Sequence, residues 1–395
     1  MRLLAVRLLV VTGCALFARS AEPSSPAARP EPRLTFLGDF NIPTGTSFGA
    51  LADTDFGGIS GLVFHPRLGK LLALSDSRMK SRFYILDFKI GEGIVEAVPV
   101  DVVLLRDARG QIFDSGVLDP EAIALTGRGT LLVASEGDSE REPRVNPAIF
   151  EFDLHGRWIR AIPVPEKFLM SEENPPRKGV RNNKGFESLT VSPDGRRLFA
   201  GTESTLIQDG MITEPDGGGY SRIIEYRLDE TPPPAVREYA YYLEPLTVPP
   251  HWGPSRSSNG LAELLALDDT HFLALERGFV TETEGPSPRN YSRVRIYLIS
   301  LAGASDVSRR LGLETSPDWI PVSKQLLLDL DDVVSELSPG FRSLDNFEGM
   351  CFGPDLRDGS RSLVMVSDNN FRERQRTAFL LFKLEDDSCS LAANR

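Results

Sequence analysis

The chain contains five copies of one pattern, and this internal repeat limits the fold more than any other feature of the sequence. Each copy reaches a Glu, or a Ser in the first copy, then continues as an apolar run, turns at Pro, Asp, Gly or Arg, and runs apolar into a final acid. Two such runs joined by a turn are typical of a β-hairpin. The copies are GGISGLVFHPRLGKLLALSDS (57–77), LDPEAIALTGRGTLLVASEGD (118–138), NKGFESLTVSPDGRRLFAGTES (183–204), SNGLAELLALDDTHFLALERGF (258–279) and DNFEGMCFGPDLRDGSRSLVMVSDNNF (345–371). Self-similarity of this kind predicts a repeat architecture.

Further alternating runs follow the hairpins and predict additional strands. Third strands are expected at 83–90, 148–154, 223–228, 294–301 and 379–384, and fourth strands at 94–105, 158–165, 236–245 and 319–330. Only the last repeat lacks a fourth strand, and the strand RLTFLGDF (33–40) is left unmatched near the N-terminus. Pairing it with the last repeat would close a ring and remove its open edges.

We therefore predict an all-β fold, a β-propeller of five four-stranded blades closed by an N-terminal strand that pairs with the C-terminal blade. Six blades are the alternative, if a diverged unit lies within 204–258 or 301–345. A short helical turn is expected near 331–338. A large β-sandwich would also contain short alternating strands, but it gives no reason for an acid to recur at equivalent hairpin positions.

In a propeller the first strand of each blade lines the central channel, so the recurring residues converge on one axis. The expected ring contains Ser60, Glu121, Glu187, Glu263 and Glu348, with a second layer from Asp76, Glu136, Glu203, Glu276 and Asp368. Carboxylates gathered in this way repel one another, and burial further disfavours their charged form. Oxygen ligands without clustered histidines suit Ca²⁺, or alternatively Mg²⁺ or another divalent cation, better than zinc. The alternative is that each Glu only caps backbone amides at the inner edge of its blade. The segment DTDFGG (53–58) is a further candidate ligand loop.

Basic residues lie close to the same loops and are candidates for binding anionic oxygens. They are Arg177, Lys178, Arg181 and Lys184 before Glu187, and Arg78, Arg277 and Arg372 after second-strand acids. Lys184 and Arg277 are the preferred catalytic pair because each is nearest to a ring acid; the alternative is that they only pair with those acids. His251 is a candidate general acid. The remaining histidines, at 65, 155 and 271, fall in or beside expected turns and are expected at the surface.

Composition and missing motifs exclude several function classes. The chain has 44 Lys and Arg against 56 Asp and Glu, a net charge of −12, so it lacks the basic footprint of a nucleic-acid-binding protein. No Gly-x-Ser-x-Gly elbow, P-loop, dinucleotide fingerprint or Arg-His-Gly motif occurs in the sequence.

The N-terminus has the features of an export signal. Residues 1–21 combine early arginines with a short apolar core, which predicts a signal peptide and a periplasmic or secreted protein without a transmembrane segment after its removal. The alternative is a lipoprotein box, VTGC (11–14), with a lipid anchor at Cys14. Residues 22–33 form a Pro/Ser-rich tether, and 34–395 form one propeller domain. Cys351 and Cys389 then form either one disulfide or two free thiols.

Six segments, spread over about 57–384, resemble the phytase-like family, described as "esterase-like activity of phytase". They are GGISGL, DPEAIA, NKGFESLTVSPDG, NGLAELLAL, NFEGMCF and VSDNNF. The resemblance implies a propeller and hydrolysis of a phosphoester or an ester. A more distant likeness to calcium-dependent β-propeller phytases implies several Ca²⁺ ions holding phosphate at an acidic funnel.

Together these features favour a secreted or periplasmic hydrolase, assisted by a metal, that acts on a small anionic or ester substrate at the mouth of the propeller. One alternative is a non-catalytic propeller that binds a ligand or a protein. Another is a metal-dependent lactonase-like propeller.

Overall fold

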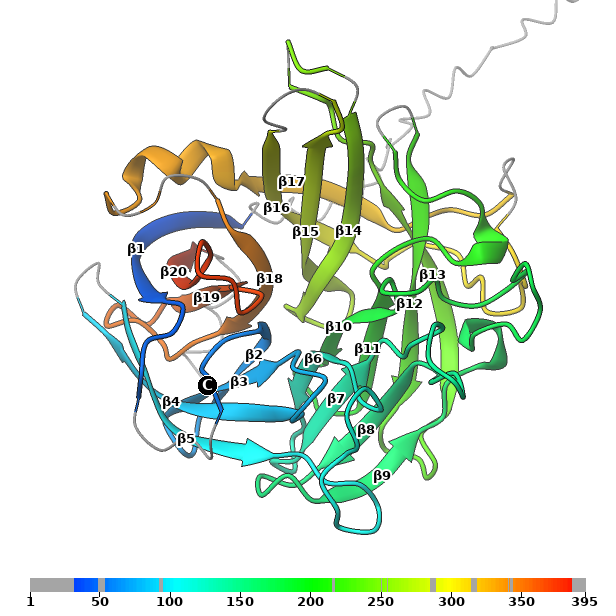
Figure 1. The fold of residues 1–395 in the computed structure, drawn as a ribbon, viewed down its shortest axis with the longest axis horizontal. Coiled ribbons are helices and arrows are strands. Elements are labelled where there is room, and N and C mark those ends of the chain that lie inside the picture. The colour runs from blue at the N-terminus through cyan, green and yellow to red at the C-terminus, as the bar shows by residue number, and fades with distance from the viewer. Residues whose placement is uncertain are drawn as a thin grey trace, which may run out of the picture.

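The computed structural model describes residues 32–48, 54–91, 95–214, 217–249, 251–253, 255–284, 289–313, 318–339, 341 and 344–385. Within them, strands β1 to β20 form five antiparallel sheets of four strands each, arranged around a common centre (Figure 1). The expected signal peptide, Cys14 and nearly all of the tether lie outside these residues. No helix in the described part of the chain is long and apolar enough to cross a membrane.

The sheets are the predicted blades, and the count of five is confirmed. Blade one contains β2 (Ile59–His65), β3 (Lys70–Ser75), β4 (Arg82–Ile90) and β5 (Val95–Leu104), and blade two contains β6 (Pro120–Leu125), β7 (Leu131–Ser135), β8 (Ala148–Phe152) and β9 (Trp158–Ile162). Blade three contains β10 (Phe186–Val191), β11 (Arg197–Thr202), β12 (Gly219–Arg227) and β13 (Ala235–Leu243), and blade four contains β14 (Ser255–Ala266), β15 (His271–Glu282), β16 (Asn290–Ser300) and β17 (Ser323–Asp329). Blade five contains β18 (Asn346–Phe352), β19 (Arg361–Asp368), β20 (Arg376–Glu385) and β1 (Arg33–Pro43). Short 3-10 helices occupy Glu166–Phe168, Ile207–Asp209 and Leu330–Glu336, the last where a helical turn was expected.

The hydrophobic core consists of layers between neighbouring blades. Five clusters of buried side chains each join two adjacent sheets; one, for example, packs Leu62 and Leu71 of blade one against Val364 and Phe379 of blade five. Second strands such as β3 and β7 are almost wholly buried, which explains their continuous apolar sequences. Each blade is therefore held by burial on both faces.

The N-terminal strand closes the ring as predicted. β1 pairs with β20 in antiparallel register from Arg33 opposite Glu385 to Pro43 opposite Arg376. The ring of Phe36 packs edge-on against Phe382, with centroids 5.6 Å apart. β1 thus covers a strand edge that would otherwise be free to pair with another chain.

Every first strand carries a β-bulge at the same place in its hairpin. In each blade the register with the second strand shifts by one residue, so one residue has no partner. The unpaired residues are Ser60, Glu121, Glu187, Ala262 and Glu348. A bulge bends the strand and re-aims the side chain of the extra residue, so four of these five positions turn a polar side chain out of the regular alternation.

The bulge corrects the expected equivalence in the fourth repeat. Ala262, and not Glu263, is the unpaired residue of β14. Glu276 pairs with Leu261 in the way that Ser75 pairs with Ile59 in blade one. Arg277 therefore stands where the other blades have their second-strand acid. The sequence alone favours Glu263 and Glu276 as the equivalent residues because they are the glutamates at about the right spacing. Strand pairing instead assigns these two positions to Ala262 and Arg277, each one residue away.

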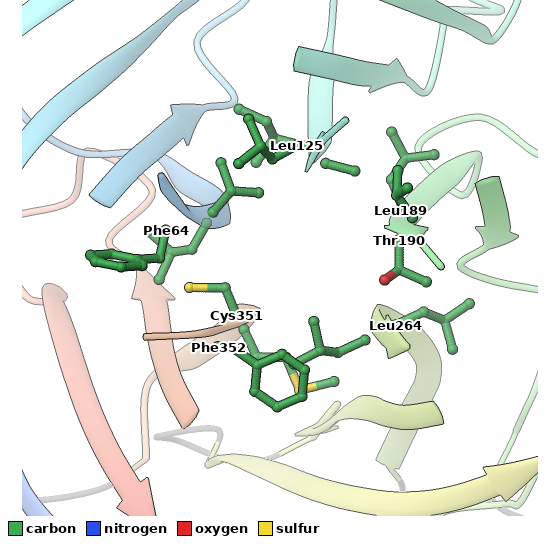
Figure 2. Close-up of a pocket in the computed structure, with 14 residues that line it drawn as sticks. Phe64, Leu125, Leu189, Thr190, Leu264, Cys351 and Phe352 are labelled. Atoms are coloured by element: carbon green, nitrogen blue, oxygen red, sulfur yellow. The ribbon is translucent and has the colours of Figure 1, made fainter. Parts of the chain in front are cut away.

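Beyond the bulges, the first strands continue into an apolar part of the channel. A cavity of about 160 Å³ is lined there by residues from all five blades, among them Phe64, Leu125, Leu189 and Leu264 (Figure 2). Cys351 also lines it as a buried free thiol, whose pKa is raised by burial. Cys389 lies outside the described residues.

The closure generates a stability prediction. Phe36→Ala removes the β1 side chain that packs against Phe382, and we expect it to lower the free energy of unfolding by about 2 kcal/mol. This loss is smaller than for a fully buried phenylalanine because Phe36 is only partly buried. The matched control is Thr35→Ala, at an exposed position of the same strand, with an expected change within about 0.5 kcal/mol. Urea unfolding monitored by circular dichroism measures both. Equal effects of the two substitutions would contradict the proposed contribution of this contact.

Candidate metal and active site

The bulges, the ends of the second strands and the residue before β6 gather eight carboxyl groups at one mouth of the channel. We call this set the acid ring: Asp76, Asp119, Glu121, Glu136, Glu187, Glu203, Glu348 and Asp368. Glycines before the bulges make room for it. A Cβ atom at Gly185 would lie 2.8 Å from Glu136 Cα, and one at Gly260 would lie 2.6 Å from Glu203 Cγ. These positions therefore exclude side chains so that neighbouring blades can approach.

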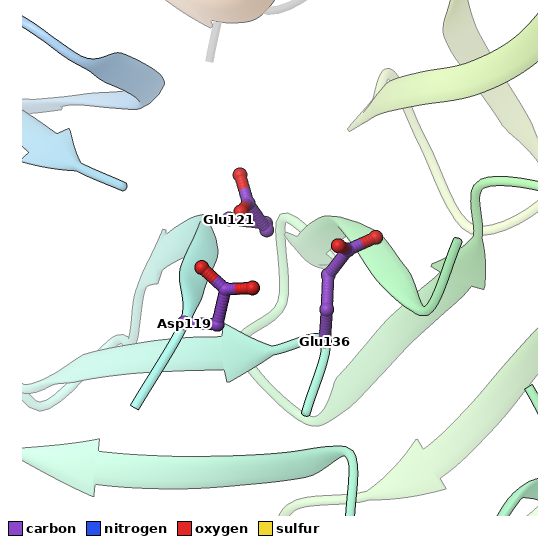
Figure 3. A group of neighbouring side chains, drawn as sticks. All are labelled: Asp119, Glu121 and Glu136. Atoms are coloured by element: carbon purple, nitrogen blue, oxygen red, sulfur yellow. The ribbon is translucent and has the colours of Figure 1, made fainter. Parts of the chain in front are cut away.

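Two groups of three acids lie close enough to share a cation. Asp119, Glu121 and Glu136 each offer an oxygen atom, and these atoms lie within 4.8 Å of one another. The three side chains lie beside one another in Figure 3. Glu136, Glu187 and Glu203 meet the same criterion. Glu136 belongs to both groups. A set of carboxylate oxygens without histidine or cysteine fits a hard cation such as Ca²⁺ or Mg²⁺.

Burial and mutual repulsion raise the pKa values of the ring acids. Burial, followed by the charge of Glu348, raises the pKa of Asp76 to about 7. Burial, followed by the charge of Glu203, raises the pKa of Glu136 to about 8. The pKa values of Glu121 and Glu187 are raised well above the ordinary range by the same two causes. Without a cation, part of the ring therefore holds protons near neutral pH.

Among the described residues, three basic side chains form ion pairs with acids of the ring and offset part of its negative charge. Lys184 Nζ lies 2.8 and 2.7 Å from the two carboxylate oxygens of Glu203. One terminal nitrogen of Arg277 lies 3.3 Å from Glu203 and 3.0 Å from Glu348, and the neighbouring carboxylates raise the pKa of Arg277 despite its burial. The third side chain, Arg78, approaches Asp119 to 2.5 Å. Lys184 and Arg277 thus both pair with ring acids, and a catalytic role for either stays a prediction.

Glu263 and Glu276 were expected in the ring, but their described contacts are with other residues. Glu263 accepts backbone N–H groups from Leu189 at 3.3 Å and Leu264 at 2.9 Å, so it links blades three and four in the manner of the amide-capping alternative. Glu276 accepts hydrogen bonds from the Tyr241 hydroxyl and the Asn259 amide and pairs with Lys324. The described contacts of these two glutamates do not join them to the acid ring.

The histidines are placed differently from one another. His251 is exposed, and its backbone carbonyl accepts a hydrogen bond from Arg289 at 3.1 Å; within the described residues, no contact links it to the acid ring. His65 was expected at the surface but is only 5% exposed, because the β2–β3 turn folds over it and the Leu68 N–H donates to its Nδ1. His155 is exposed, and His271 is half-buried beside Asp268.

For the remaining basic candidates, the described contacts are with residues outside the acid ring. Arg177 and Lys178 form ion pairs with Glu173 and Glu166, respectively. Arg181 donates to backbone carbonyls, and Arg372 is exposed. Of DTDFGG, Asp53 lies outside the described residues, and the Asp55 carbonyl accepts a hydrogen bond from Arg82.

Asp119 and the Arg78–Asn183 contact were not predicted. Asp119 stands two residues before the bulge, where blades one, three and four have Gly58, Gly185 and Gly260. An acid at a position that three other repeats fill with glycine therefore indicated in the sequence that Asp119 differs from its counterparts. Arg78 donates to the Asn183 side chain at 2.9 Å, and this contact between two loops had no sequence signal.

Comparisons with known proteins agree with the repeat. A model of the family "Phytase-like: Esterase-like activity of phytase" matches residues 54–371. An "Uncharacterized secreted protein" of Arthroderma benhamiae is 26% identical over 183 residues, which are 40% of this chain and 34% of that protein. The chain thus matches about a third of the length of that relative. The solved structure "KlHsv2 with loop 6CD replaced by a Gly-Ser linker" shares 8% identity and a TM-score of 0.23, over 62% of this chain and 74% of that one, a similarity too low to bear on fold or function.

The family model covers most of the chain, including all five bulges and every member of the acid ring. The chain therefore belongs to the phytase-like family.

Proposed function

We propose that this protein is an exported, divalent-cation-dependent hydrolase that acts on a phosphoester or an ester at the mouth of the propeller. One observation carries the proposal: two clusters of three acidic residues have Glu136 in common. The clusters are Asp119–Glu121–Glu136 and Glu136–Glu187–Glu203. Membership of the phytase-like family and a relative named as secreted support the class of reaction and the export.

The donor set fits one or two hard cations, with Glu136 as the residue able to contact both. When bound, a divalent cation polarises a substrate oxygen and lowers the pKa of water next to it. These carboxylates would hold the cation. Its binding would displace the protons that the buried acids otherwise retain.

Arg277 has the position best suited to an anionic substrate. It replaces an acid of the repeat, and the bulge residue of the same hairpin is Ala262, so the blade-four sector of the mouth carries a guanidinium and no carboxylate from these two positions. Its Nε is buried without a hydrogen-bond partner among the described residues. Arg277 and Lys184 would stabilise charge that develops on substrate oxygens. A small phosphoester or ester is accordingly the proposed substrate class.

A non-catalytic, ligand-binding propeller is the alternative, and the pairing of Lys184 and Arg277 with Glu203 favours it. In that case the cation would only stabilise the loops. The following experiments separate cation binding from turnover.

Cation binding is tested by thermal unfolding. Native-state binding should raise stability by about 2.7 kcal/mol at a cation concentration 100 times Kd, and the midpoint should continue to rise with the logarithm of concentration. Glu136→Gln should remove most of this increase because both carboxylate groups lose a member. Glu140→Gln, an exposed site in the same loop, should leave it intact. A midpoint that ignores Ca²⁺, Mg²⁺ and Mn²⁺ would sink the metal proposal.

Turnover is tested with p-nitrophenyl phosphate and p-nitrophenyl acetate in the presence of each cation. We expect Arg277→Met to lower kcat by about a hundredfold or more, as for removal of a charge-stabilising donor. Arg372→Met is the matched control, since Arg372 also follows a second-strand acid but is exposed; its kcat should be unchanged. Cation binding without hydrolysis above the Glu136→Gln level would favour the ligand-binding alternative.

The raised pKa values predict how the cation-free protein responds to pH. A carboxyl with a raised pKa binds more protons folded than unfolded, so its contribution is fully present below its unfolded pKa of about 4 and is lost as pH rises through the folded value. For Asp76 and Glu136 these folded values are about 7 and about 8. Urea unfolding after removal of divalent cations should therefore give lower stability at about pH 8.5 than at about pH 5.5, and added cation should restore it. Higher stability at the alkaline pH would contradict this assignment.

A further inference from the structure

A second pocket lies outside the acid ring, between the loops of blades two and three. Its volume is about 310 Å³, and its lining includes Ser139, Arg144, Met170, Val180, Arg181 and Asn182. Ser139 follows the ring acid Glu136 by three residues, and Asn182 precedes Lys184 by two. The pocket therefore belongs to the same face of the propeller as the mouth.

The two arginines of this pocket are held without being neutralised. Arg181 donates from Nε to the Thr205 carbonyl at 3.1 Å and from a terminal nitrogen to the Gly210 carbonyl at 2.6 Å. Arg144 donates from one terminal nitrogen to the Ser171 carbonyl. In the part of the chain that the structure describes, neither has a carboxylate partner. Backbone carbonyls thus fix the guanidinium groups and leave their charge and several N–H groups available.

Two basic residues close by in the sequence differ from these arginines in having carboxylate partners. The chain is acidic overall, and Arg177 and Lys178, on the same segment, both have glutamate partners. Burial lowers the pKa of Arg181, with no opposing contribution from a carboxylate. A partly desolvated cation without a counter-ion is unfavourable in the free protein. An anion entering the pocket would remove that cost.

The other walls define what kind of anion fits. Met170 and Val180 are buried apolar side chains with exposed fractions of 6% and 2%. The Asn182 side chain accepts the Ser139 N–H at 2.9 Å, which fixes the rim. The pocket therefore combines a cationic end with an apolar wall, a combination typical of sites for amphipathic small molecules.

We propose that this pocket binds an oxyanion carried on an apolar body, a carboxylate or a phosphate monoester on an alkyl or aryl group. Arg144 and Arg181 bind the oxyanion through their planar N–H groups, and Met170 and Val180 contact the apolar part. The site is independent of hydrolysis at the acid ring.

The test is calorimetric titration of the full-length protein, freed of divalent cations on a chelating resin, with hexanoate and with hexyl phosphate. Without cations the acid ring repels anions, so binding reports on the pocket. We expect saturable binding of at least one probe, and the tighter one identifies the oxyanion. Arg144→Gln should weaken binding by about tenfold or more, the loss expected for a hydrogen bond to a charged group.

Arg177→Gln is the matched control, because Arg177 is exposed and pairs with Glu173; it should leave the affinity unchanged. Arg181→Gln should act like Arg144→Gln, and if loss of its two carbonyl contacts unfolds the loop, Arg144→Gln decides the question alone. Hexanol should bind more weakly than the anions. The proposal is overturned if neither anion saturates, if binding survives Arg144→Gln, or if hexanol binds as tightly as the anions.

Discussion

The bulge in the first strand of every blade is the constraint on which the functional face depends. A regular strand would alternate its side chains between the two faces of the sheet, and those faces are filled by the layers between blades. An unpaired residue escapes that alternation. Glu121, Glu187 and Glu348 reach the mouth in this way. The fold thus sets aside one position per blade that burial does not require to be apolar.

The electrostatics of the mouth follow from that geometry. Among the described residues, three basic side chains form ion pairs with the eight carboxyl groups, so ion pairing alone leaves part of the negative charge uncompensated. Protons are one remedy and a divalent cation is another, and both act on the same oxygens. The replacement of one acid by Arg277 breaks the symmetry of the ring and gives the mouth a cationic side. A mouth with carboxyl groups on one side and a guanidinium on the other is chemically asymmetric although its scaffold is repetitive.

The sequence was sufficient for the blades and insufficient for the register. Repeated hairpins, third and fourth runs, and the unmatched strand at 33–40 predicted the architecture because each is a pattern of apolar residues that burial demands. The expected positions agree with the structure at Glu121 and Glu187, which occupy bulges, while their role as metal ligands stays a prediction. The expected equivalence was wrong at Glu263 and Glu276, since which residue goes unpaired is decided by hydrogen bonding with the partner strand. His65 and the contact of Arg78 with Asn183 depend on how loops fold back, which apolar patterns do not encode.

The closing sheet also orders events during folding. β1 and β20 are separated by more than 300 residues, from Pro43 to Arg376, so their pairing is a contact of very long range. Such contacts form late, because the intervening chain must first lose its freedom. The four blades built from continuous sequence can assemble locally, while the fifth waits for the last strand to be synthesised. Until then β1 lacks its partner strand and its edge remains uncovered, and this interval is when the chain is most open to association with other chains.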